Sequence, residues 1–252
     1  MNKTILSIVC FLQLTSSISA QDMFRATEQG SISSSFSESK KTISYIKKST
    51  LVAFESNSTV DSWVMFKGNI ENKNLQFHAS RVRISSKKVV GLFNRRTENC
   101  DWSVHFLNTS SEATVLGNKK IMSKDGVSSA FSEVWYKHIY TDIDARFYSS
   151  KEGIQYSMIV KPMADIDQIA IKWQGVERLH IEKQNTLLYN TPDGTKCRGK
   201  VRAYQLIDGE EIEVDILLHL HKNTLRFKPL FYNRDYPLVI DTPVLVSVTK
   251  ED

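Results

Sequence analysis

Few residues in this sequence have a type and spacing that suggest chemistry, and the clearest are two aspartates. Asp142 and Asp144 lie two positions apart, so on a strand they would share one face about 7 Å apart. Paired carboxylates at that separation suit glycoside hydrolysis or, with backbone oxygens, calcium binding. We favour a structural interpretation, in which Asp142 caps a turn and Asp144 accepts hydrogen bonds from nearby backbone N–H groups. Asp165 and Asp167, in a loop after Pro162, are interpreted in the same way.

Two histidines, His219 and His221, would also share a face and offer two imidazoles to a metal ion. A metal site needs at least one further ligand, and the sequence nominates none, so we expect both to be exposed on an edge strand. No nucleophile elbow, zinc-protease helix, phosphate loop or dinucleotide-binding glycine pattern occurs. The sequence therefore predicts no catalytic residue, no metal and no cofactor.

Cysteine and tryptophan each leave two interpretations open. Cys100 and Cys197 could form a disulfide in an oxidising compartment, or both could be buried thiols. A Cys–His nucleophile built from Cys100 and His105 has no recognisable activating context. The tryptophans could form a sugar-stacking platform, but such side chains more often fill a core, and we favour the core. They are Trp63, Trp102, Trp135 and Trp173.

The N-terminal residues predict export. Lys3 provides a positive start, the stretch from Ile5 to Leu14 is mainly apolar, and small residues end at Ala20. We expect a signal peptide over 1–20, cleaved after Ala20, and a protein that is secreted or held at the cell surface. The apolar run is shorter than the ~20 residues that a helix needs to span a bilayer, and no later segment predicts a transmembrane helix.

The charge of the chain is modestly basic. Formal net charge is +5, and removing Lys3 leaves 32 basic and 28 acidic residues, a net charge of +4. Paired basic residues would suit an anionic surface such as acidic polysaccharide or lipid headgroups, although we favour solvated loop tips because acidic residues are interspersed. Nucleic acid is not an expected partner. The pairs are Lys47-Lys48, Lys87-Lys88, Arg95-Arg96 and Lys119-Lys120.

The segments that must position these residues alternate between apolar and polar side chains, and this period of two is typical of strands. Trp102, Val104 and Phe106 alternate with polar residues, and the pattern recurs along the chain between turn signals such as Asp193-Gly194 and Asp208-Gly209. The strongest alternation, over 212–220, predicts one strand. A short helix over 132–139 competes with a strand there, because short apolar runs are ambiguous.

The fold class that follows is all-β, an antiparallel β-sandwich-type architecture with little helix. The length allows one large domain or two packed β subdomains. In the second case we place them at 49–126 and 127–249, after a poorly ordered lead-in at 21–48.

The region from Tyr136 to Asp241 resembles a known family through several short segments in a fixed order. They are HIYTDIDARFY at 138–148, GIQYSMIV at 153–160, AYQLIDG at 203–209 and YPLVID at 236–241. This order is similar to the uncharacterised β-rich N-terminal domain of bacterial (Bacteroidota-like) cell-surface proteins, which usually precedes SBBP-type β-propeller repeats. Thr141-Asp142 stands where that family usually has Pro-Gly, and this sequence ends at Asp252 without the repeats. The resemblance implies surface association and no catalytic residues.

Three functions follow as hypotheses. We favour an exported, surface-associated structural or interaction module without enzyme activity, which supports cell-surface assembly or adhesion by binding a cell-envelope protein or polysaccharide. The first alternative is a carbohydrate-binding β-sandwich module that uses exposed aromatic residues. The second is a glycoside-hydrolase-like enzyme that uses Asp142 and Asp144.

Overall fold

The computed structural model describes residues 53–56, 63–70, 72–121, 130–150 and 153–246. The expected signal peptide and lead-in lie outside these ranges. Within them nearly every element is a strand, apart from two short 3-10 helices, η2 (Ile166–Gln168) and η3 (Lys183–Asn185). The prediction of an all-β chain with little helix is confirmed.

The strands are β1 (Phe54–Ser56), β2 (Phe66–Ile70), β3 (Lys73–Phe77), β4 (Arg81–Val90), β5 (Arg96–Phe106), β6 (Thr114–Lys120), β7 (Ala130–Tyr140), β8 (Ile143–Ser150), β9 (Gly153–Val160), β10 (Ile171–Gln174), β11 (Glu177–Glu182), β12 (Thr186–Asn190), β13 (Lys196–Lys200), β14 (Arg202–Ile207), β15 (Glu210–Glu213), β16 (Ile216–His221), β17 (Thr224–Pro229) and β18 (Leu238–Val246).

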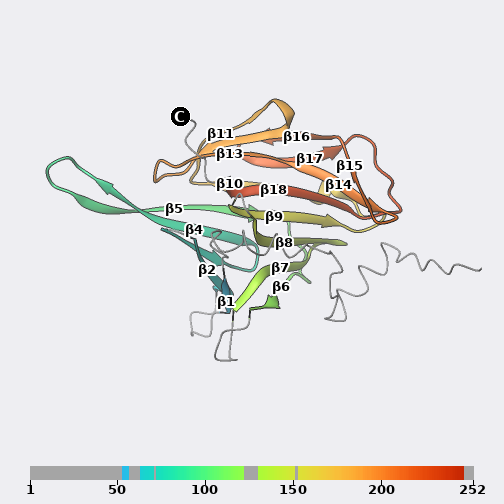
Figure 1. Cartoon of the computed structure of the whole chain (residues 1–252), viewed down its shortest axis with the longest axis horizontal. Helices are drawn as coiled ribbons and strands as arrows, with labels where there is room; N and C mark the ends of the chain where they lie inside the picture. Colours follow the sequence, from blue (N-terminus) through green and yellow to red (C-terminus); the bar gives the residue numbers. More distant parts are fainter. Residues whose placement is uncertain (1–52, 57–62, 71, 122–129, 151–152, 247–252) are drawn as a thin grey trace, which may run out of the picture.

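Fifteen of these strands form one large antiparallel sheet (Figure 1). Its order is β15-β14-β18-β9-β8-β7-β1-β2-β3-β4-β5-β10-β17-β16, with β6 paired to β7 beside this path. Strands β11, β12 and β13 form a smaller second sheet. Tight turns make many of the connections. One is the two-residue turn Asp208-Gly209 between β14 and β15, where both residues have the positive φ that such hairpins require.

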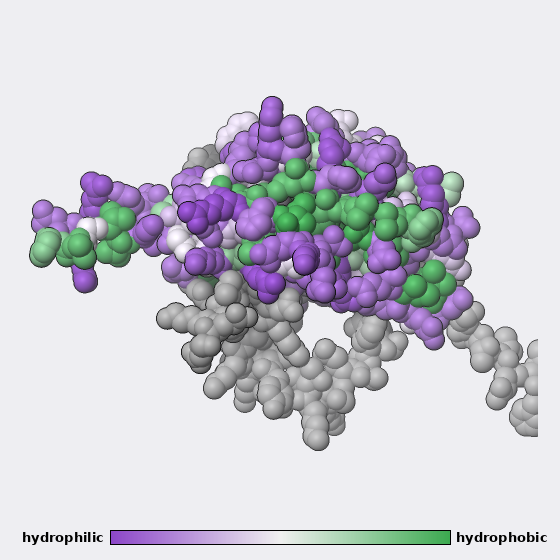
Figure 2. All heavy atoms as spheres, turned by 90° about the horizontal axis from the view of Figure 1, so that it is seen from above, coloured by the Kyte–Doolittle hydropathy of each residue, from purple (hydrophilic) through white to green (hydrophobic). Residues whose placement is uncertain are grey.

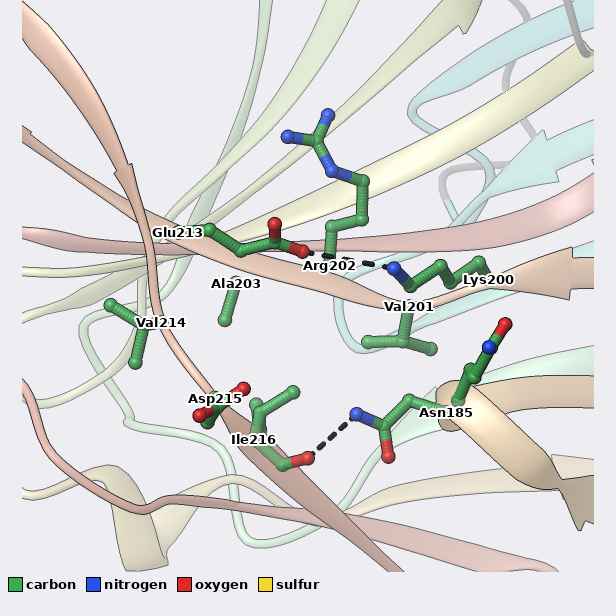
Figure 3. Close-up of a pocket in the computed structure, with 10 residues that line it drawn as sticks. Asn185, Lys200, Val201, Arg202, Ala203, Glu213, Val214, Asp215 and Ile216 are labelled. Atoms are coloured by element: carbon green, nitrogen blue, oxygen red, sulfur yellow. Dashed lines mark hydrogen bonds and ion pairs between the residues drawn. The ribbon is translucent and has the colours of Figure 1, made fainter.

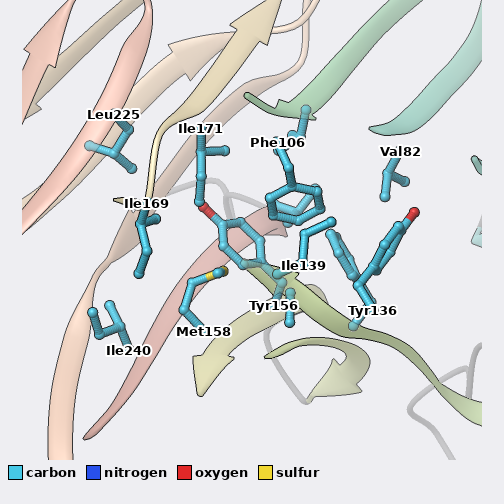
Figure 4. Close-up of a cluster of buried hydrophobic side chains, with 14 of the residues drawn as sticks. Val82, Phe106, Tyr136, Ile139, Tyr156, Met158, Ile169, Ile171, Leu225 and Ile240 are labelled. Carbon is cyan, nitrogen blue, oxygen red and sulfur yellow. The ribbon is translucent and has the colours of Figure 1, made fainter. Parts of the chain in front are cut away.

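The core forms where the two halves of the large sheet face each other. Phe77 of β3 packs on Phe147 of β8 with ring centroids 5.5 Å apart, and Phe106 of β5 lies 6.3 Å from Tyr156 of β9. Figure 4 shows Phe106 and Tyr156 within this cluster, with aliphatic side chains around them. Each of these strands places alternate residues in the core, so the layered, sandwich-type packing follows from the period-two pattern.

The small sheet closes one side of the same core. Trp102 of β5 and Trp173 of β10 stack with centroids 5.7 Å apart, and Tyr189 of β12 lies 4.8 Å from Trp173. All three side chains are buried. One cluster of buried residues therefore includes side chains from both sheets.

Strands from the two expected subdomains are hydrogen-bonded to each other. β5 pairs with β10, and β1 pairs with β7. The boundary placed between residues 126 and 127 falls outside the described residues.

The prediction of one strand over 212–220 is wrong. Residues 210–213 form β15, residues 216–221 form β16, and these two strands stand at opposite ends of the strand order. Only Val214 and Asp215 separate them, and three extended steps span about 10 Å, so the sheet curves until its two ends approach. The alternation in the sequence does not reveal this break. Val214 and Ile216 are both buried, so the period of two continues unchanged from β15 into β16.

The helix considered for 132–139 does not form, since these residues belong to β7. This strand pairs with β6 and β8, and its register with β8 shifts between Tyr136 and Tyr140, where His138 has a φ of +52°. The irregularity changes which residues face the core, so the apolar residues do not follow a clean period of two.

The hairpin of β4 and β5 extends past the rest of the molecule (Figure 1). β3 pairs with β4 only up to Ser85, and β10 pairs with β5 only from Ser103 onward. Between these points the two strands pair with each other as far as Val90 and Arg96. Among the described residues, the outer part of the hairpin is therefore a two-stranded ribbon.

Candidate interaction surface

The two aspartates singled out by spacing do not share a strand face. Asp142 lies in the turn between β7 and β8, with a φ of +57°. Asp144 lies in β8 and is only 3% exposed. Its carboxylate accepts hydrogen bonds from Lys137 Nζ and from the backbone N–H of His138, both at 2.8 Å. Asp144 therefore has the structural role that we favoured, and it is not open to a substrate. Asp165 caps η2 by accepting from the N–H of Asp167.

The histidine and cysteine candidates also lie apart from any assembled site. His219 and His221 are exposed on β16, at an end of the large sheet. Among the described residues, no group of three potential metal ligands occurs. Cys100 and Cys197 are both buried and are not bridged to each other. The thiol of Cys197 is hydrogen-bonded with Tyr189, and burial raises the pKa of the Tyr189 hydroxyl well above its usual value.

Three of the four tryptophans are buried. Trp102 and Trp173 stack inside the core, and Trp135 is 8% exposed. Trp63 is 81% exposed. A sugar-stacking platform on the described surface would therefore have one tryptophan, not several.

A small pocket of about 210 Å³ lies where the two ends of the large sheet approach each other (Figure 3). Lys200 and Glu213 point toward one another across it with an Nζ–Oε1 distance of 3.7 Å, and Asn185 donates to the carbonyl oxygen of Ile216 at 2.7 Å. Its lining contains no histidine, cysteine or serine. The pocket thus offers no hydroxyl or thiol nucleophile of the serine or cysteine type and no imidazole base.

One outer side of the large sheet carries paired charges, with the carboxylates Glu133 and Asp144 buried, and we call it the paired face. Its central row crosses β7, β8, β9, β18 and β14 in register, and its members are Trp135, Arg146, Ser157, Asp241 and Arg202.

Carboxylates of the paired face lie against cations or hydrogen-bond donors. Glu133, 5% exposed, accepts from Trp135 Nε1 at 2.9 Å and lies 2.7 Å from Lys119 Nζ. Burial alone would raise the pKa of Glu133, but the hydrogen bonds from Lys119 and Trp135 and the charge of Arg146 lower it overall. The carboxylate of Asp241 accepts a hydrogen bond from Ser157 Oγ. This bond lowers the pKa of Asp241, but burial has the larger effect and raises it overall.

The opposite outer side, over β4, β5 and β10, carries cations in excess, and we call it the basic face. Its register places Arg81, His105 and Lys172 in one row across three strands. Burial, followed by the charges of Arg81 and Lys172, lowers the pKa of His105. The neighbouring Arg83 pairs with Asp101 at 2.7 Å. For Arg81 and Lys172, no described carboxylate lies within ion-pair distance.

The basic face continues into the projecting hairpin, whose tip is apolar. The loop side chains of Leu92 and Phe93 are 91% and 97% exposed, and Val89 is 63% exposed. Two basic pairs border them, Lys87-Lys88 on β4 and Arg95-Arg96 at the start of β5. Figure 2 shows apolar atoms at the end of this projection among hydrophilic ones.

The base of the hairpin is fixed to the turn between β12 and β13. The carboxylate of Asp193 accepts from Ser86 Oγ on β4 at 2.7 Å and lies 3.3 Å from Lys73 Nζ on β3. Burial would raise the pKa of Asp193, but hydrogen bonds from Thr191, Ser86 and Thr195 hold it well below its usual value. A largely buried carboxylate therefore anchors the exposed hairpin to the body.

Sequence reasoning found the basic pairs but missed the apolar tip between them. The signal was present as Val89-Val90-Gly91-Leu92-Phe93, an apolar stretch between Lys87-Lys88 and Arg95-Arg96. We favoured solvated loop tips, and alternation alone does not show that a hairpin extends beyond its neighbouring strands.

Comparison with family models matches residues 53–244 to a domain of unknown function designated DUF7948. The chain belongs to the DUF7948 family. The matched range includes the core, both outer faces and the projecting hairpin, so these are features of the DUF7948 domain of this chain. Comparison with curated proteins found no match, and comparison with solved structures found none. Within the described residues, the DUF7948 domain has no helix with the length and apolar character of a membrane span.

Proposed function

We propose that this chain is an exported, surface-associated interaction module that binds a component of the cell envelope and carries no catalytic activity. The observation that supports this most directly is the β4–β5 hairpin, which extends past the body and exposes Leu92 and Phe93 almost completely. Exposed apolar patches rimmed by polar residues usually mark interaction sites. The basic pairs at 87–88 and 95–96 provide such a rim.

Export is the second part of the proposal, and it rests on the N-terminal residues. Lys3, the apolar stretch from Ile5 to Leu14 and the small residues up to Ala20 have the composition of a cleavable signal peptide. The resemblance to domains that precede SBBP-type repeats in bacterial surface proteins agrees with this location. The module would support surface assembly or adhesion in such a setting.

The positions of the two candidate catalytic aspartates favour a binding function over a catalytic one. Asp144 is held by Lys137 and His138, and Asp142 lies in a turn. The glycoside-hydrolase alternative would therefore need residues other than Asp142 and Asp144, and the carbohydrate-binding alternative retains one exposed tryptophan, Trp63.

Fractionation of cells that produce the chain tests the proposal. We expect mature protein that begins at Gln21 and is recovered with the cell envelope. A variant with Lys87, Lys88, Arg95 and Arg96 all changed to glutamine should be exported equally well but should be released from the envelope. Protein retained in the cytosol with its leader intact would refute export, and equal envelope association of the variant would refute the role of the hairpin.

A further inference from the structure

The projecting hairpin arranges its side chains in layers along its length. Leu92 and Phe93 stand at the tip, Arg95 and Arg96 follow directly behind them, and Lys87 and Lys88 lie further toward the body. The last strand pair is Val90 with Arg96. At about 3.3 Å per strand residue, Lys87 lies roughly 10 Å behind that pair.

This order matches the order of layers at a lipid surface. A bilayer has a hydrocarbon core of about 30 Å within a total thickness of about 40–45 Å, which leaves a headgroup layer of several ångströms on each side. A tip that reaches the boundary of that layer would place Arg95 and Arg96 beside the phosphates. Lys87 and Lys88 would then lie near the membrane surface, within the ~10 Å over which charges act in salt solution.

We propose that the β4–β5 hairpin docks on an anionic lipid bilayer, with Leu92 and Phe93 at the boundary between headgroups and acyl chains, Arg95 and Arg96 against lipid phosphates, and Lys87 and Lys88 further from the membrane, near its charged surface. This inference rests on the proposed interaction function and names its partner. It concerns contact with the surface of a bilayer.

Charge complementarity supports an anionic partner. From Lys87 to Glu98 the hairpin has four basic residues and one acidic residue. Glu98 forms an exposed ion pair with Arg96 at 2.8 Å, which leaves Lys87, Lys88 and Arg95 without a described carboxylate within ion-pair distance. Each basic residue near an anionic membrane strengthens binding about fivefold.

The apolar tip favours lipid over an acidic polysaccharide. A polysaccharide could neutralise the basic residues, but it would leave Leu92 and Phe93 in water. The tip is also convex, so a protein partner would need a matching apolar groove lined by acidic groups. A bilayer offers both environments without such a preformed shape.

The hairpin backbone limits the depth of insertion. Beyond Ser86 and Cys100, β4 and β5 pair only with each other among the described strands. The backbone N–H and C=O groups on their outer edges therefore form no hydrogen bonds to a further strand. Such groups are costly in hydrocarbon. Insertion is therefore confined to the side chains of the tip, a shallow contact that salt should weaken.

Vesicle co-sedimentation of the full chain tests the proposal. One set of vesicles is phosphatidylcholine, and the other contains about 30% of the anionic lipid phosphatidylglycerol. We expect binding to the second set and little to the first. Leu92→Ser with Phe93→Ser should lower the partition coefficient about tenfold or more.

The chain contains a matched control for this variant. Leu230 and Phe231 form another exposed Leu-Phe pair, 44% and 89% exposed. The register of β17 against β10 directs that pair toward the end of the molecule opposite the hairpin. Leu230→Ser with Phe231→Ser should bind as the unchanged chain does. All versions share the same N-terminal residues, so any difference arises from the substituted pair.

A fluorescence measurement tests the depth of the contact. Phe93→Trp should gain emission that nitroxide-labelled lipids quench, whereas Phe231→Trp should gain emission that they do not quench. Equal quenching of both would contradict docking through the hairpin. So would equal binding to the two vesicle sets, or vesicle binding that survives Leu92→Ser with Phe93→Ser.

The outcomes separate this inference from the proposed function. If the chain does not bind anionic vesicles but the tip substitutions still release it from the cell envelope, the lipid partner is refuted and the interaction function stands, with a protein or polysaccharide partner. If the tip substitutions change neither vesicle binding nor envelope association, both are refuted.

Discussion

The two outer sides of the large sheet carry charge in opposite ways. On the paired face, a row across five strands contains Arg146, Asp241 and Arg202, and the nearby Glu133 and Asp144 are each held by cations. On the basic face, the row of Arg81, His105 and Lys172 has no carboxylate. The same fold thus balances charge on one side and accumulates it on the other.

Burial accounts for the difference. Glu133 and Asp144 are 5% and 3% exposed, and a charge removed from water must be compensated by a partner or a hydrogen bond. Of the hairpin cations, Lys87, Arg95 and Arg96 are exposed and Lys88 is half-buried, so water solvates most of this charge and folding does not require partners for it. Charge pairing on the first side therefore serves stability, whereas the unpaired charge on the second is available to an external partner.

The pH dependence of stability should separate the histidines from the buried carboxylates, and it is the largest effect that we expect because several groups titrate together. Folding lowers the pKa of His78 and His105 from 6.5, chiefly through burial, so protons bind the unfolded chain more readily and stability falls as the pH drops below that value. The lowered pKa values of Glu133 and Asp193 make stability fall again as the pH drops below about 4. Asp241, whose pKa burial raises, contributes with the opposite sign.

Urea unfolding midpoints measured between about pH 7 and pH 3 would reveal both phases. Replacing both histidines, His78→Asn and His105→Asn, should flatten the upper phase and leave the lower one. A stability that rises continuously on acidification would contradict the assignment.

A single substitution on the paired face should have the next largest effect. Glu133→Gln keeps the shape of the side chain but removes the charge that faces Lys119 and Arg146, and we expect a loss of about 2–3 kcal/mol in the free energy of unfolding. Glu98→Gln on the hairpin is the control, because the Glu98 side chain is 47% exposed and its pair with Arg96 is solvated. Its effect should stay within about 0.5 kcal/mol. Equal losses for both variants, measured by urea unfolding, would remove the distinction between the faces.

Much of the fold could be predicted from the sequence because strand alternation is a local property. The burial of Trp102, Val104 and Phe106 and the hairpin turn at Asp208-Gly209 follow directly from residue order. The break after Glu213 could not be predicted, because it leaves the alternation in phase and depends on how the whole sheet curves.

The candidate surface was harder to predict than the fold. The basic pairs at 87–88 and 95–96 are visible in the sequence, but their significance depends on β3 and β10 ending before the hairpin does. That depends on which distant strands become neighbours. The spacing of Asp142 and Asp144 misled for a related reason, since the turn between β7 and β8 includes the first of them.

Gly91→Ala should have a small, local effect on stability and the most informative one on the hairpin. Gly91 has a φ of +93°, and an added Cβ would lie 2.6 Å from the carbonyl oxygen of Asn94, so the loop must rearrange. Because the tip lies beyond the body, we expect the strain to be relieved locally, with about 1 kcal/mol lost from the local opening free energy of the hairpin. Hydrogen exchange at 87–99 measures this loss.

The control for this substitution is Gly209→Ala in the turn between β14 and β15. Gly209 has a φ of +86°, but no atom lies within 4 Å of an added Cβ, so the substitution adds backbone strain without a clash. Gly91→Ala also keeps Leu92, Phe93 and every charge, so weaker vesicle binding by this variant alone would show that docking requires the geometry of the loop as well as its composition. Unchanged exchange in both hairpins would mean that the loop at 91–95 already adopts other conformations, and the ordered tip would then not be the surface that a partner meets.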